Sequence, residues 1–242
     1  MARLLPKVVK MAAILRVPAW RRALLCHRVA AGAEHLCVLR QLEGCQLVFD
    51  IGANRGQFAL VARQCFPSAR IVSFEPLPGP AAIFRRVFAQ DDAVTLHEAA
   101  VGPQVARGMM HVSARDDSSS LLPIAPLQSS LFPGTAEVGT TEVAVAPLDS
   151  FVSAADIAMP ALLKLDVQGF ELVALAGCAP LLAHFDWVYC ECSFVELYAG
   201  QKLAADVIEW LSAKGLRLWG MFNPVYDSHG RAVQADFLFG RL

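Results

Sequence analysis

Short apolar runs alternate with helical patterns along most of the chain. Continuous apolar runs predict strands that are buried on both faces, whereas apolar residues spaced three and four apart predict helices. Strands are expected near residues 46–51, 70–75, 94–97, 161–166, 187–192, 216–222 and 235–239. Helices are expected near residues 56–66, 81–89, 170–176 and 204–214. This alternation predicts an open, mostly parallel α/β sheet with right-handed crossovers, closed by an antiparallel last pair.

Two segments fall outside this alternation. Residues 1–45 carry seven basic side chains before the first acidic residue, Glu34, and predict two short amphipathic helices that break at Pro18. We favour a basic helical extension that caps a domain spanning residues 46–242. The alternative is contact with an anionic membrane surface or a phosphorylated glycan carrier. Residues 102–159 hold two β-like runs around a polar, Pro-rich loop, which indicates a functional loop or an inserted hairpin.

Composition narrows the protein class. Hydrophobic residues make up 55% of the chain, and the mean hydropathy is +0.44. No apolar run approaches the ~18 residues of a membrane span, so a sheet buried on both faces explains the excess better. The net charge of −1 gives no case for nucleic-acid binding. Seven cysteines without a C-x-x-C pair predict reduced thiols, and hence a cytoplasmic location.

The turn after the first strand carries the first candidate chemistry. Gly52, Asn54 and Gly56 predict a tight turn that a ligand can approach closely. The spacing lacks the glycine triplet of a dinucleotide fingerprint and the Lys-Ser/Thr ending of a P-loop. Asp50 would repel a pyrophosphate but suits a sulfonium group. Glu75, at the end of the second strand, stands where an acidic side chain can hold ribose hydroxyls. Together these residues favour S-adenosylmethionine over NAD.

Ionisable side chains recur at the ends of the other predicted strands. Ligands of open α/β sheets bind beyond the carboxyl ends of the strands. The candidates at those ends are Asp50, Glu75, His97 or Glu98, Asp166 and Glu191. We expect them to converge on one rim of the sheet, which would be the active site.

Four motifs resemble the FkbM family of S-adenosylmethionine-dependent methyltransferases. They occupy residues 49–56, 73–76, 98–102 and 163–171. The last is the most specific, because it carries the pattern K-x-D-x-x-G-x-E directly after a buried strand. The resemblance implies a class I methyltransferase (Rossmann-like) fold with seven strands, helices on both faces and an antiparallel last strand. It also implies S-adenosylmethionine as the methyl donor and, usually, O-methylation.

The resemblance also implies roles for single residues. The first turn would wrap the methionine end of the cofactor, Glu75 would hold the ribose, and Glu98 and Ala99 would lie beside the adenine. The implied cofactor-binding residues are Asp50, Gly52, Ala53, Asn54, Gly56, Glu75, Pro76, Glu98 and Ala99. Asp166 would face the sulfonium and the acceptor.

A hydroxyl acceptor gains from a base that removes its proton during attack. Asp166 is the first candidate and Glu191 the second; the sequence has no ligand cluster that demands a metal. Both carboxylates also have a structural interpretation. Asp166 could cap the helix that follows it. Glu191 lies in an apolar strand, where a buried carboxylate needs a polar or charged partner. Glu171 is expected to stabilise the first turn of its helix. His97 and His111 are expected to be structural.

The acceptor is expected to be a hydroxyl of a small molecule or a glycan. Residues 102–141 would shape its pocket, with Ser118 to Ser120 as candidate contacts. Two other functions stay open at this point: a Rossmann-type NAD-dependent oxidoreductase, and a nucleotide-binding protein without catalysis. The missing glycine triplet counts against the first.

Overall fold

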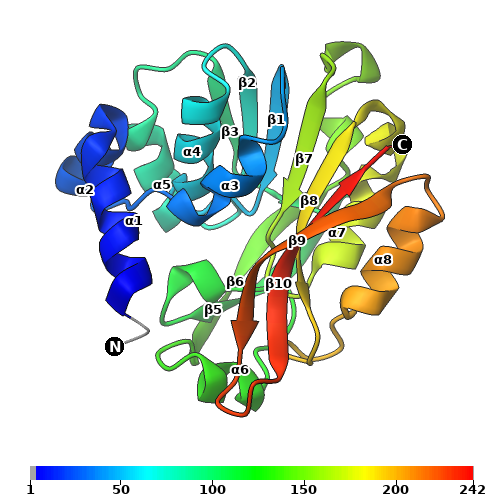
Figure 1. Cartoon of the computed structure of the whole chain (residues 1–242). Coiled ribbons are helices and arrows are strands. Elements are labelled where there is room, and N and C mark those ends of the chain that lie inside the picture. Colours follow the sequence, from blue (N-terminus) through cyan, green and yellow to red (C-terminus); the bar gives the residue numbers. More distant parts are fainter. Residues whose placement is uncertain (1–3, 242) are drawn as a thin grey trace.

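A seven-stranded sheet forms the centre of the protein (Figure 1). The computed structural model describes residues 4–241, and the side chains of residues 10–241. The strand order is β3 (Val94–His97), β2 (Arg70–Phe74), β1 (Leu47–Ile51), β7 (Ala161–Leu165), β8 (Trp187–Ser193), β10 (Ala232–Gly240) and β9 (Arg217–Tyr226). Neighbouring strands from β3 to β8 are parallel, whereas β10 is antiparallel to both β8 and β9. The predicted sheet and its antiparallel last strand are confirmed.

Helices cover both faces of the sheet, which is why every residue of β1 and β7 is buried. Along β1, Leu47, Phe49 and Ile51 join the core under α7 (Glu171–Cys178) and α8 (Ala204–Ser212). Val48 joins the core on the other face, under α4 (Gln57–Cys65) and α5 (Pro78–Val87). Successive side chains of a strand point to opposite faces, so an unbroken apolar run fills both cores.

The N-terminal segment extends the second of these cores. It contains α1 (Leu4–Arg16), α2 (Pro18–His27), η1 (Ala33–His35) and α3 (Leu36–Leu39), with the break beside Pro18 as predicted. Figure 1 shows α1 and α2 in blue beside α4 and α5. Trp20 is 1% exposed, and its Nε1 donates to the carbonyl oxygen of Leu60 at 2.9 Å. None of the helices between residues 4 and 241 is long and apolar enough to cross a bilayer.

The region between β3 and β7 forms a second, smaller sheet. Its order is β4 (Ala100–Val101), β6 (Glu137–Ala146) and β5 (Ala106–Ser113), with β5 and β6 antiparallel. The predicted inserted hairpin is therefore confirmed. The shorter elements of this part of the chain are η2 (Asp116–Ser118), α6 (Pro126–Leu131), η3 (Leu148–Ser150) and η4 (Ala154–Asp156), while η5 (Ala179–His184) follows α7.

The chain reverses its winding direction between β1 and β7. From β1 it proceeds to β2 and β3 on one side, and from β7 to β8 and the closing pair on the other. At such a switch point the connections leave in opposite directions and open a crevice beyond the strand ends. The two turns also approach closely there: Gly52 has a φ of +79°, and a Cβ on it would lie 1.8 Å from the carbonyl oxygen of Asp166.

We expect Gly52→Ala to destabilise the fold strongly. The matched control is Gly44→Ala, because Gly44 has a similar φ of +68° but nothing within 4 Å of an added Cβ. The control should cost about 1–2 kcal/mol of unfolding free energy from the left-handed backbone alone. Gly52→Ala should cost more by roughly 2 kcal/mol or above, because the added carbon meets backbone rather than a flexible side chain. Urea denaturation of both variants measures the difference; equal losses would contradict the close approach of the two turns.

Candidate active site

A cleft of about 850 Å³ opens beyond the carboxyl ends of the central strands. Its wall is formed by the turns after β1, β2 and β7, by residues 99–101 after β3, by Glu191 of β8 and Gln234 of β10, by the inserted region, and by the N-terminal segment. The predicted convergence of strand ends on one rim therefore holds for most, though not all, of the candidate residues.

A buried ion pair lies beneath the turn after β1. Asp50 is fully buried, and Lys164 Nζ lies 2.8 Å from its Oδ1. Nζ also donates to the carbonyl oxygens of Ile51 at 3.4 Å and Gly52 at 3.0 Å. Burial alone would lower the pKa of Lys164, but the nearby charges of Asp50 and Asp166 outweigh it and raise that pKa above its ordinary value. Lys164 is therefore charged.

The position of Asp50 differs from the prediction. Asp50 and Lys164 are directly paired residues of neighbouring strands, so their side chains share one face of the sheet. Asp50 is not part of the cleft wall. Asp50 supports the turn from below through Lys164, whereas the prediction placed it at the methionine end of a cofactor.

The glycine turn itself is divided between two roles. Gly52, Ala53 and Asn54 line the cleft. Asn54 has a φ of +46°, and its Oδ1 accepts the N–H of Arg55 at 2.9 Å, which stabilises this conformation. Gly56 does not line the cleft: a Cβ there would lie 2.6 Å from the Phe88 ring, so this glycine allows close packing against α5. The predicted cofactor contact at Gly56 is therefore corrected to a packing role.

Glu75 ties the end of β2 to the glycine turn. Its Oε2 accepts the N–H of Asn54 at 2.9 Å, and its Oε1 accepts the N–H of Leu77 at 2.7 Å. Burial raises the pKa of Glu75 to about 7, although both of these hydrogen bonds favour the charged form. Glu75 and Pro76 both line the cleft. The carboxylate thus stands where the ribose prediction requires it.

At the end of β3 only one of two predicted residues reaches the cleft. Ala99 is buried and lines it, whereas Glu98 is exposed and pairs with Arg85 on α5. Neighbouring residues in extended chain point to opposite sides, so Ala99 reaches the cleft and Glu98 points away from it. The adenine contact of Ala99 stays a prediction, and the position of Glu98 does not agree with one. His97 stacks on Phe74 with ring centroids 5.0 Å apart, which fits a structural role.

A glutamine joins the two predicted catalytic carboxylates. Gln168 Nε2 donates to Asp166 Oδ1 at 2.7 Å and to Glu191 Oε2 at 3.0 Å. The other oxygen of Glu191 accepts Gln234 Nε2 at 2.7 Å. Burial and the charges of Asp166 and Asp236 raise the pKa of Glu191 well above its ordinary value. Asp166 and Glu191 thus share one wall of the cleft, held in a fixed arrangement.

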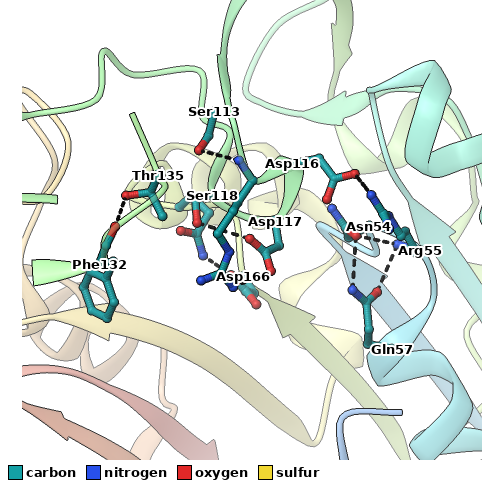
Figure 2. A network of polar contacts seen from close by, with 12 residues as sticks. Asn54, Arg55, Gln57, Ser113, Asp116, Asp117, Ser118, Phe132, Thr135 and Asp166 are labelled. Atoms are coloured by element: carbon teal, nitrogen blue, oxygen red, sulfur yellow. Dashed lines mark hydrogen bonds and ion pairs between the residues drawn. The ribbon is translucent and has the colours of Figure 1, made fainter. Parts of the chain in front are cut away.

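The loop that follows β5 reaches both sides of this site, and Figure 2 shows its contact with the glycine turn between Asp116 and Arg55. Asp116 accepts a hydrogen bond from Arg55 Nε at 3.1 Å, which links η2 to the glycine turn. Ser120 Oγ donates to the carbonyl oxygen of Gln168 at 2.6 Å, which links the loop to the turn after β7. Of the predicted contact residues, Ser118 and Ser119 line the cleft, and Ser120 instead anchors the loop.

Glu171 begins α7 and has the structural role that was predicted. Its Oε1 accepts the N–H groups of Val167 at 3.2 Å and Gly169 at 3.0 Å. Burial raises the pKa of Glu171 to about 7. The side chain therefore shapes the turn that carries Asp166 and Gln168.

The N-terminal segment supplies cleft residues that sequence reasoning missed. Its members with ionisable side chains are Lys10, Arg28, Glu34 and His35. Lys10 Nζ and Glu34 Oε2 lie 2.6 Å apart, which fastens α1 to η1. These residues belong to no recognised motif. The only signal in the sequence is that Glu34 and His35 interrupt an otherwise basic and apolar segment.

The strand order, the glycine turn and the acidic rim define an α/β protein of Rossmann-like fold with a cleft at the carboxyl ends of its strands. A model of the methyltransferase FkbM domain matches residues 50–218. The chain belongs to the FkbM methyltransferase family, which favours a methyltransferase over an oxidoreductase or a non-catalytic protein.

Two similar proteins agree with this assignment. The chain is 31% identical over 171 residues to the 2-O-methyltransferase NoeI of Sinorhizobium fredii, an alignment that covers 68% of this chain and 70% of that protein. It also resembles the crystal structure of a candidate O-methyltransferase from Klebsiella pneumoniae, at 14% identity and a TM-score of 0.54, with 98% and 96% of the two chains covered. The structural likeness shows the fold, and the family and NoeI support O-methylation that depends on S-adenosylmethionine.

We expect Lys164→Met to destabilise the protein by ~3–5 kcal/mol, because it leaves the Asp50 charge buried without a partner. The surface control Lys202→Met should change the unfolding free energy by less than about 0.5 kcal/mol. The double variant Asp50→Asn/Lys164→Met should recover part of the loss, since no charge is then left unpaired. Chemical denaturation compares the three. A Lys164→Met variant as stable as the Lys202 control would show that the pair does not hold the turn.

Proposed function

We propose that the protein transfers a methyl group from S-adenosylmethionine to a hydroxyl of a small molecule or glycan. One observation carries this proposal: a single cleft is lined by a ribose-type carboxylate, Glu75, and by a second acidic group, Asp166, on the two sides of a glycine turn. Negative groups suit a donor that is cationic at sulfur and carries a ribose. The name of NoeI supports oxygen as the atom that receives the methyl group.

The residues present fit this donor. Ala53 and Asn54 offer backbone at the turn, and Glu75 keeps lone pairs that can accept the ribose hydroxyls. Ala99 is small enough to leave space beside the adenine. When bound, the donor supplies a methyl group already activated by sulfonium, so orientation and exclusion of water are the main tasks of the protein.

The acceptor is proposed to enter beside Asp166 and Glu191. The carboxylate of Asp166 would face the sulfonium, and its free oxygen would bind an acceptor hydroxyl. Ser118 and Ser119 add polar contacts from the loop after β5. The seven thiols are all free, which supports the proposed cytoplasmic location.

The function is tested by binding and transfer together. Calorimetric titration with S-adenosylmethionine, S-adenosylhomocysteine and NAD should show binding of the first two alone. Labelled methyl from S-adenosylmethionine should then appear on at least one member of a panel of saccharides and small hydroxyl compounds. Binding of NAD in place of S-adenosylmethionine would overturn the proposal, as would methylation confined to nitrogen or carbon acceptors.

We expect Glu75→Gln to weaken S-adenosylmethionine binding by roughly 10- to 100-fold, the equivalent of losing ~1.5–3 kcal/mol of charged hydrogen bonds. Glu98→Gln is the matched control, because Glu98 lies outside the cleft and should bind normally. Because the pKa of Glu75 is raised to about 7 and the charged carboxylate accepts hydroxyls better, wild-type affinity should rise through neutral pH. Calorimetry at several pH values checks both points; equal affinity of the two variants would remove Glu75 from the ribose role.

A further inference from the structure

His35 lies at the end of η1 and presents one edge of its ring to the cleft. It lines the same cleft as Asp166 and Glu191, although it comes from the N-terminal segment. Its side chain is 17% exposed. The ring packs edge-on against Phe58 and Tyr189, with centroid distances of 5.3 Å and 5.6 Å. Such contacts hold the imidazole in one orientation.

The other edge of the ring is fixed by a polar chain of side chains from β8, β10 and β9. His35 Nδ1 lies 3.0 Å from Tyr189 Oη. Tyr189 Oη lies 2.8 Å from Asp236 Oδ2. Asp236 Oδ2 also accepts a hydrogen bond from Asn223 Nδ2 at 2.7 Å. The three side chains behind His35, of which Tyr189 and Asp236 are buried, therefore form a continuous network.

This network assigns the tautomer of His35. Tyr189 has one hydroxyl proton, and the carboxylate of Asp236 is the stronger acceptor for it. Tyr189 can then only accept a hydrogen bond from His35, so Nδ1 carries the proton. In the neutral ring this leaves a lone pair on Nε2.

Nε2 is the atom left for the cleft. No side chain that the structure describes forms a hydrogen bond with Nε2. Nε2 is also absent from the buried polar atoms that have no partner, so it is not sealed inside the protein. Burial lowers the pKa of His35 below its ordinary value of 6.5, and the ring is therefore neutral at pH 7. A neutral imidazole with a free lone pair is the form that can accept a proton.

We propose that His35 is the base that removes the proton of the acceptor hydroxyl. This inference rests on the proposed O-methyl transfer. As the hydroxyl oxygen bonds to the methyl carbon, the methyl–sulfur bond breaks and its electron pair stays on sulfur as a neutral thioether. The hydroxyl proton moves to Nε2. Asp236 Oδ2 lies 3.6 Å from Nδ1 and stabilises the imidazolium that forms.

The carboxylates favoured by the sequence suit this step less well. Both oxygens of Glu191 already accept amide N–H groups, from Gln168 and Gln234. Asp166 Oδ1 also accepts from Gln168. A neutral imidazole is a common general base near neutral pH, and no side chain that the structure describes forms a hydrogen bond with the Nε2 of His35. Asp166 then binds and orients the hydroxyl that His35 deprotonates.

The test compares His35→Gln with His27→Gln in the full chain, since His27 lies at the end of α2 and outside the cleft wall. His35→Gln should lower kcat by ~10²–10⁴-fold while S-adenosylmethionine affinity and Tm stay near wild type. His27→Gln should leave all three unchanged. If wild type transfers methyl groups and His35→Gln turns over within a few fold of it, the role of His35 is wrong and O-methylation stands. If wild type shows no transfer to any hydroxyl, the proposed function itself fails.

The pH profile separates a base from a residue that only shapes the cleft. Wild-type kcat should rise with pH through an apparent pKa below 6.5 and then level off, and His35→Gln should remove this rise. The charged and titratable groups that face His35 are Lys10, Glu34, Lys164, Asp166, Tyr189 and Asp236. Asp166→Asn should keep the acid limb at a lower kcat. If the limb persists in His35→Gln and disappears in Asp166→Asn, Asp166 is the base and the inference is overturned.

Discussion

A buried charge pair underlies the geometry of the whole site. Lys164 places one ammonium group against Asp50 and against two carbonyl oxygens of the turn after β1. Removing both charges from water is costly, so such a pair is poor evidence for stability in itself. Its effect is positional: it fixes the carboxyl ends of β1 and β7 against each other. Every candidate residue beyond those strands is placed relative to that junction.

Three parts of the chain complete the cleft around this junction. The motif after β7 contributes Asp166 and holds it through Gln168, whose amide also engages Glu191 on the next strand. The inserted region reaches both ends of the cleft through Asp116 and Ser120. The N-terminal segment forms the remaining wall. The cleft therefore combines residues that are distant in sequence, and its polar lining is largely organised by hydrogen bonds.

Sequence patterns located strand ends well and side-chain directions poorly. Continuous apolar runs predicted β1 and β7 because both faces of the sheet are covered. Whether the side chain of Asp50 or Glu98 enters the cleft depends on the pairing of strands and on the twist of the turn, which a single sequence does not display. His35 was missed for a different reason: its partner Tyr189 lies 154 residues later, and neither belongs to a motif. Contacts of that range become visible only in the folded chain.

The shared wall between the N-terminal segment and the sheet bears on how this enzyme can be divided or recombined. The family match begins at residue 50, yet Lys10 and several residues between 28 and 35 line the cleft, and Trp20 packs in one core with α4. A chain that started at residue 46 would lose this wall and open the cleft to bulk water. The smallest unit that can be exchanged between homologues is therefore the N-terminal segment together with the domain that follows it. A chimera joined between these two parts would combine cleft walls from two different proteins.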